Sequence, residues 1–186
     1  MSDDLSPVVA AAAQWLARAY PAVGGVFAAT LSEVQARQAA TVAAWLRYPT
    51  STDAALLDLL GPGGSDRLDG LGGADPAERP HEDHGWRTWV DEVVVSWAAC
   101  LLSDPDLAAA AVAALAHSAH ARGYEGGFAR LTRPSERDVA AAALLRHPDL
   151  LAPVADLHRA ELVALLEAGP DVRDAPEPDA DSADAA

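Results

Sequence analysis

Apolar side chains recur at intervals of three and four residues along most of this chain, the spacing of one face of an α-helix. The clearest pattern spans residues 85 to 103 and consists of Trp86, Val90, Val93, Trp97 and Leu101. It predicts the central core helix of the fold. Large aromatic residues on such a stripe are usually buried, so we expect Trp86 and Trp97 in the core. Trp89 lies off the stripe and is predicted to be an exposed anchor for a partner.

The same spacing, together with proline and glycine punctuation, predicts six further helices. They cover residues 6–20, 21–48, 52–60, 106–122, 135–147 and 149–168. In the second of these, Gly24 and Gly25 either loosen the first turn or delay the start of the helix. Pro153 is expected to bend the last helix. The apolar residues of helix 21–48 include Val23 and Phe27, and its polar face carries Glu33, Gln35, Arg37 and Gln38.

Two helix starts carry specific capping signals. Asp104 followed by Pro105 is typical of an N-cap residue with proline at the first helical position. Ser135 with Asp138 three residues later resembles a capping box at the start of helix 135–147. The fold class predicted from these elements is all-α: a single helical bundle-like domain of about six to seven helices, spanning residues 1–169.

Two segments depart from the helical pattern. Residues 61–84 contain six glycines, three prolines and many charges, which predicts a long loop within the helical domain. Residues 170–186 are rich in Asp, Pro and Ala and carry one arginine against six acidic residues. Such a composition cannot bury enough apolar surface to offset the entropy of ordering, so a disordered acidic tail is predicted there.

The charge and composition exclude several classes of function. A formal net charge of −15 disfavours electrostatic binding to DNA or RNA. The chain contains no lysine, which excludes a P-loop lysine, a Schiff-base lysine and a kinase-type ATP lysine. No apolar run approaches the ~20 residues that span a bilayer, so no membrane segment is predicted. With a single cysteine and no basic region at its start, the chain is predicted to be cytoplasmic.

The densest cluster of candidate ligand side chains is His81-Glu82-Asp83-His84. Two histidines three residues apart contribute to a Zn²⁺ or Ni²⁺ site if a further ligand approaches from elsewhere in the fold. His117 and His120 are candidates, because their spacing places them on one face of the predicted helix 106–122. The cluster is not a His-Glu-x-x-His motif, however. The interpretation we favour is an acidic helix start, in which Asp83 caps a helix beginning near Gly85.

Nucleophilic catalysis and nucleotide binding have little support in the sequence. Cys100 lies between Ala99 and Leu101 on the apolar helix 85–103, where a thiol is expected to be inert core. The chain has no Gly-x-Ser-x-Gly elbow, and its glycine-rich loop lacks the Gly-x-Gly-x-x-Gly spacing. No catalytic residue and no cofactor are therefore predicted.

Two short stretches, Leu60-Gly61-Pro62-Gly63 and Glu78-Arg79-Pro80-His81-Glu82-Asp83-His84, lead into the apolar helix. Together they resemble the TorD/NarJ-type chaperones of redox-enzyme maturation, which are cytosolic all-helical proteins with a Pro…Asp-His signature before a central helix. The resemblance covers about a dozen residues. It implies that Asp83 and His84 lie in a peptide-binding region and that the partner is an apoenzyme or its leader peptide.

Three classes of function remain open from the sequence. The preferred one is a non-enzymatic interaction factor, such as an adaptor, assembly factor or chaperone, that binds a protein partner through a helical surface and the acidic loop. Its predicted partner-binding residues are Glu78, His81, Asp83, His84, Trp86 and Trp89. The first alternative is a metal-binding helical protein or metal-dependent enzyme that uses His81, His84, His117 and His120. The second is an acidic mimic of nucleic acid.

Overall fold

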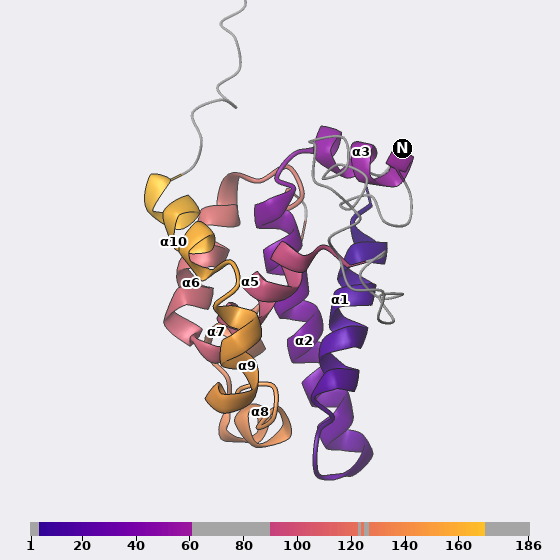
Figure 1. Ribbon diagram of the computed structural model, residues 1–186, viewed down its shortest axis with the longest axis vertical. Helices are drawn as coiled ribbons and strands as arrows, with labels where there is room; N and C mark the ends of the chain where they lie inside the picture. Colours follow the sequence, from indigo (N-terminus) through magenta and orange to yellow (C-terminus); the bar gives the residue numbers. More distant parts are fainter. Residues whose placement is uncertain (1–3, 61–89, 123, 125–126, 170–186) are drawn as a thin grey trace, which may run out of the picture.

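The computed structural model describes residues 4–60, 90–122, 124 and 127–169 of the chain. These residues form nine α-helices and one short 3₁₀ helix, with no β-strand among them (Figure 1). The predicted all-α fold class is thereby confirmed. The predicted loop 61–84 and the predicted tail 170–186 lie outside the described residues.

The first two helices, α1 (Ser6–Ala19) and α2 (Gly25–Arg47), form an antiparallel hairpin (Figure 1). Gly24 and Gly25 have φ angles of 124° and 85°. Glycine adopts this region at little cost because it has no Cβ, and here it delays the start of α2, as one of the two sequence alternatives predicted. Most of the buried side chains on α2 are small, so its neighbours approach its backbone closely. They include Ala36, Ala39, Ala40, Ala43 and Ala44.

Helix α5 (Glu92–Ser103) is the centre of the fold and packs against α2 and α9. Every residue from Val94 to Leu102 is buried, as expected for a helix that is apolar all round. The predictions of a central helix and of a buried Trp97 are confirmed. The predicted continuous helix 85–103 is wrong at its start, since Val90 and Asp91 are not helical. Instead the Asp91 side chain caps α5 by accepting from the Val93 and Val94 amides.

The second half of the chain is divided into shorter helices than the sequence pattern predicted. They are α6 (Pro105–Ala114), the 3₁₀ helix η2 (Leu115–His117), α7 (Ala129–Thr132), α8 (Glu136–Ala141), α9 (Pro148–Ala155) and α10 (Arg159–Ala168). Both predicted capping signals are confirmed: Asp104 caps α6, and Ser135 with Asp138 forms a capping box at α8.

The predicted helix 149–168 is two helices, and its break lies after Ala155 rather than at Pro153. Hydrogen bonds from α5 hold the connection between them. The His158 amide donates to Ser96 Oγ at 3.0 Å, and the Trp97 indole donates to the His158 carbonyl at 3.2 Å. Because these partners are about 60 residues away along the chain, local periodicity could not predict the break.

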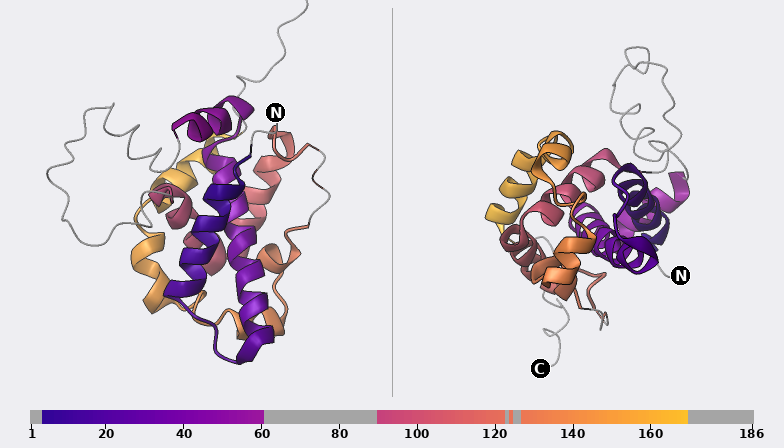
Figure 2. Two further views of the ribbon diagram at one scale, coloured as in Figure 1. Left: turned by 90° about the vertical axis from the view of Figure 1, so that its right-hand side faces the viewer. Right: turned by 90° about the horizontal axis from the view of Figure 1, so that it is seen from below.

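The two ends of the molecule differ in what they expose. Helix α3 (Ser51–Leu60), of which only Ala54 is buried, lies at one end of the long axis. The turn between α1 and α2 forms the opposite end, where α8 also lies (Figures 1 and 2). Among the described residues, no helix combines the length and apolar character needed to cross a membrane.

Candidate functional site

The partner-binding residues predicted from the sequence all fall in the segment before α5. Glu78, His81, Asp83, His84, Trp86 and Trp89 all lie outside the described residues. Their predicted roles, including the cap by Asp83 and the peptide-binding region implied by the family resemblance, stay predictions.

The predicted pairing of His117 and His120 on one helical face is wrong. Helix α6 ends at Ala114, His117 closes the 3₁₀ helix, and His120 lies in the turn that follows. His120 has structural contacts of its own: its Nε2 atom lies 2.7 Å from the Tyr48 carbonyl oxygen, and its ring stacks on Trp45. Within the described part of the chain, no three His, Cys, Asp or Glu side chains are grouped so as to hold a metal ion.

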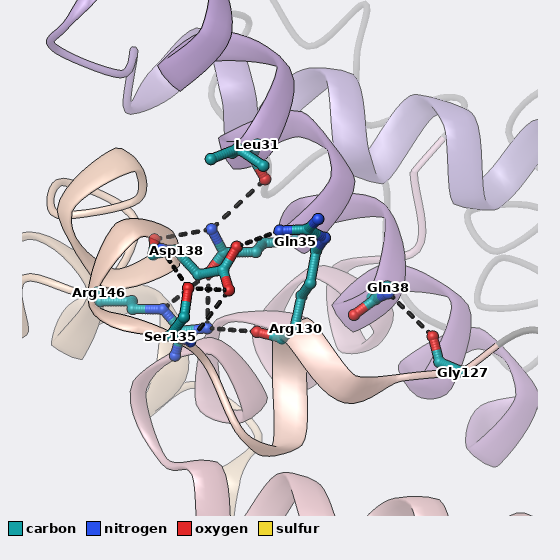
Figure 3. Close-up of polar contacts among 8 residues, drawn as sticks. All are labelled: Leu31, Gln35, Gln38, Gly127, Arg130, Ser135, Asp138 and Arg146. Atoms are coloured by element: carbon teal, nitrogen blue, oxygen red, sulfur yellow. Dashed lines mark hydrogen bonds and ion pairs between the residues drawn. The ribbon is translucent and has the colours of Figure 1, made fainter.

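An aromatic cluster attaches the segment after η2 to helix α2. The Trp45 ring contacts the rings of His120, Tyr124 and Phe128, with centroid distances of 6.0, 5.1 and 6.0 Å. Nearby, the Gln38 amide group donates to the Gly127 carbonyl at 3.0 Å (Figure 3). Edge-on and stacked aromatic pairs stabilise packing beyond their buried area, so this cluster holds an irregular segment in place.

Tyr48, the C-cap residue of α2, contacts the start of α5. Its hydroxyl hydrogen-bonds to one carboxylate oxygen of Asp91, and both residues are buried. The other oxygen of Asp91 caps α5. One carboxyl group therefore joins the end of α2 to the start of α5. Both of its oxygens have hydrogen-bond partners, which offsets the cost of burying it.

A second polar network lies between α2, α5, α7 and α8 (Figure 3). Gln35, predicted on a polar face, is instead fully buried. Its side-chain oxygen Oε1 accepts from Arg146 Nε and Nη2 at 3.0 and 2.7 Å. Its side-chain nitrogen Nε2 donates to the backbone carbonyl of Asp138 at 2.8 Å. Arg146 also donates to the Leu102 and Arg130 carbonyls. The network satisfies buried backbone and side-chain groups, as a structural clamp does.

The carboxylate of Asp138 is buried in the same network. One oxygen accepts from the Ser135 amide and hydroxyl, and the other forms an ion pair with Arg130. Burial acts to raise the pKa of Asp138, but these hydrogen bonds and the arginine charge outweigh it and hold the pKa below its ordinary value. For Arg146, burial lowers the guanidinium pKa.

Cys100 is fully buried, in agreement with the prediction of an inert core thiol. Its Sγ atom lies 2.9 Å from the Ala155 carbonyl oxygen, to which Ser96 Oγ also donates. Burial raises the pKa of the thiol, which reduces the fraction of reactive thiolate. Cys100 therefore serves the packing of α5 on α9.

Sequence reasoning missed a cluster of exposed apolar side chains at the turn between α1 and α2. Val23, Val26 and Phe27 are 78%, 86% and 68% exposed. We call these three residues the α1–α2 tip. The turn forms one end of the long axis and projects from the body of the bundle (Figures 1 and 2).

The helical pattern had grouped Val23 and Phe27 with the other apolar residues of α2. In the structure the buried positions of α2 begin only at Leu31, about a turn and a half after the helix starts. The sequence signal that separates them is Gly24-Gly25, which places Val23 before the helix and Phe27 in its first turn. Whether neighbouring helices reach that first turn is a tertiary property.

Comparisons with family models, curated proteins and solved structures found no match for this chain.

Proposed function

We propose that this protein is a non-enzymatic interaction factor, an adaptor, assembly factor or chaperone-like protein, that binds a protein partner through the α1–α2 tip. The observation that carries the proposal is the exposure of Val23, Val26 and Phe27 within five consecutive residues. Single exposed apolar side chains are common on monomers, but clustered ones are typical of interaction sites. Burying each on a partner would contribute about 1.5–3 kcal/mol.

The polar side chains with unusual environments support a binding function over a catalytic one. Asp138 and Arg146 have shifted pKa values, as many catalytic groups do. Their partners are nevertheless the capping box, Gln35 and backbone carbonyls, all of which hold helices together. The Cys100 thiol is enclosed between α5 and α9. Each group thus has a role in stabilising the fold.

The binding residues predicted from the sequence at positions 78–89 belong to the same class of function and stay predictions. They would form a second contact region, next in sequence to α5. The peptide-binding role implied by the resemblance to TorD/NarJ-type chaperones is likewise part of this proposal. No observation on the described residues favours the metal-dependent or nucleic-acid-mimic alternatives.

Site-specific photo-crosslinking in the native host tests the proposal. A benzoylphenylalanine probe at position 27 is expected to capture a defined protein, identified by mass spectrometry. The same probe at position 59 is the matched control, because Leu59 is 80% exposed on α3 at the other end of the molecule. Capture of the same set of proteins from both positions would contradict the proposal that the tip binds a specific partner.

Affinity capture with variants then assigns the contact region. Val26→Ser/Phe27→Ser is expected to lose the crosslinked protein, whereas Leu56→Ser/Leu59→Ser keeps it. Both pairs are exposed, so circular dichroism should show an unchanged fold. Asp83→Ala/His84→Ala tests the region predicted from the sequence. If only that third variant loses the partner, the tip is not the docking surface.

A further inference from the structure

The surface around the α1–α2 tip differs in charge from the rest of this acidic protein. Residues 5–32 contain one charged side chain, that of Arg18, although the whole chain carries a net charge of −15. Arg18 is exposed in the last turn of α1, which leads into the tip. These 28 residues therefore present apolar side chains and one positive charge to an approaching group. An exposed carboxylate, that of Asp149, lies beside Leu150 at the start of α9, whose carbonyl accepts from the Tyr20 hydroxyl at 3.2 Å.

The start of α2 adds to the positive character of the tip. The N-terminal end of a helix carries a partial positive charge, because its first amides point outward without helical acceptors. In α2 the first turn contains no acidic residue, and no side chain hydrogen-bonds to the cap. A side chain at Gly25 would meet nothing within 4 Å, so the backbone is open at this residue.

Exposed arginines also lie on the neighbouring part of the fold. Helix α8 lies at the same end of the molecule as the tip (Figures 1 and 2), and Gln35 of α2 bonds to its backbone. Arg133 and Arg137, before and within α8, are exposed, against the single exposed carboxylate of Glu136 there. The other carboxylate of α8, that of Asp138, is buried and paired with Arg130.

We propose that the partner segment recognised by the α1–α2 tip is apolar and carries carboxylates beside its apolar residues. This inference rests on the proposed function and names the chemistry of its partner. The apolar side chains of the segment cover Val23, Val26 and Phe27, while its carboxylates face Arg18 and the start of α2. A short segment that contacts only the tip is little affected by the distant acidic groups, because physiological salt screens charges beyond about 8 Å.

Two other occupants fit the tip less well. A second copy of this chain would bring two Arg18 side chains and two positive helix ends together. Three side chains would also supply only a small part of the roughly 800 Å² per partner that a stable interface buries. An anionic membrane is an extended surface, so it would interact with the charge of the whole protein and not with the tip alone. The net charge of −15 opposes that approach.

Selection from a random 12-residue peptide library displayed on phage, with the immobilised full-length protein, tests the proposal. Binders are counter-selected on the Val26→Ser/Phe27→Ser variant, so only tip-dependent peptides remain. We expect these to combine apolar residues with Asp or Glu. Enrichment of basic or uncharged peptides, or of none, would overturn the proposed chemistry. The crosslinking experiment decides the proposed function separately, since it requires no particular partner chemistry.

The affinity of one selected peptide then assigns the charge contact. Titration calorimetry should show about a twofold to fivefold weaker Kd for Arg18→Ser, the range expected for an exposed ion pair. The matched control Arg122→Ser, at an exposed arginine in the turn after η2, should leave the Kd unchanged. Equal effects of the two variants would overturn the contact with Arg18.

Measurements without a peptide test the two competing occupants, a second copy of the chain and a membrane. Sedimentation velocity should show the same species for wild type and Val26→Ser/Phe27→Ser, and vesicles of phosphatidylserine and phosphatidylcholine should not sediment the protein. Tip-dependent dimers, or tip-dependent vesicle binding, would each replace the peptide proposal by that occupant.

Discussion

At the scale of single residues, three buried polar side chains, those of Gln35, Asp91 and Asp138, each bond to several partners at once. Asp91 caps α5 with one oxygen and binds the Tyr48 hydroxyl with the other. Gln35 accepts from Arg146 and donates to the backbone at Asp138. A buried polar group without partners would cost the free energy of its desolvation, so removing one member of such a set affects the others as well.

The Asp138 carboxylate is expected to make stability depend on pH in the acid range. Its folded-state pKa is held below the ordinary value, so its contribution is fully present above pH about 5 and is lost as the pH falls through the folded-state pKa. Asp138→Asn should therefore destabilise the protein by about 1–2 kcal/mol at pH 7. The difference from wild type should shrink towards pH 3, as followed by urea unfolding.

Asp149→Asn is the control for this measurement. The Asp149 side chain is 87% exposed and lies 3.9 Å from His147. Its substitution should change the free energy of unfolding little at either pH. A difference for Asp138→Asn that stays constant from pH 7 to pH 3 would show that the charge of Asp138 is not what stabilises the fold.

At the scale of elements, the short helices of the second half depend on side chains that reach across the fold. Arg146, in the turn between α8 and α9, donates to Gln35 on α2, to the last turn of α5 at Leu102 and to α7 at Arg130. It thus joins three helices that are distant in sequence. The planar guanidinium group makes these bonds in fixed directions, which an ammonium group does not match.

Arg146→Met is expected to destabilise the protein by about 2–4 kcal/mol, because it leaves the Gln35 side-chain oxygen and the Leu102 carbonyl without their donor. Arg146→Lys should have an intermediate effect. Arg37→Met is the matched control on α2, since Arg37 is 63% exposed and pairs with Glu33 at 3.9 Å. It should cost about 0.5 kcal/mol or less in urea unfolding. Equal losses of stability for both arginines would show that the buried hydrogen bonds of Arg146 do not stabilise the fold more than an exposed ion pair does.

At the scale of the whole molecule, the acidic residues of segment 170–186 are expected to add negative charge without stabilising the fold. Residues 170–186 carry a charge of −5, from one arginine and six acidic residues, so the rest of the chain carries −15 + 5 = −10. The sequence-based prediction of a disordered tail therefore implies that the tail adds charge but little stability.

Truncation after Gly169 should change Tm by less than about 2 °C, as followed by circular dichroism. Leu162→Ala provides the comparison, because Leu162 is fully buried on α10 and its truncation should cost about 2–5 kcal/mol. If deleting the tail lowers Tm as much as Leu162→Ala does, the tail contributes to the folded structure and the prediction is wrong.

The sequence by itself determined the helical class, the central helix and the capping of α6 and α8. These properties are local: apolar spacing selects the helix face, and Asp104 and Ser135 satisfy amides within three residues of themselves. Only the tertiary structure decided where the later helices end, because the break before α10 is held by Ser96 and Trp97 of α5. It also decided burial: Gln35 is enclosed by an arginine 111 residues away, while Phe27 is left exposed. Periodicity records which face of a helix a residue occupies, but whether another element covers that face depends on packing between distant segments.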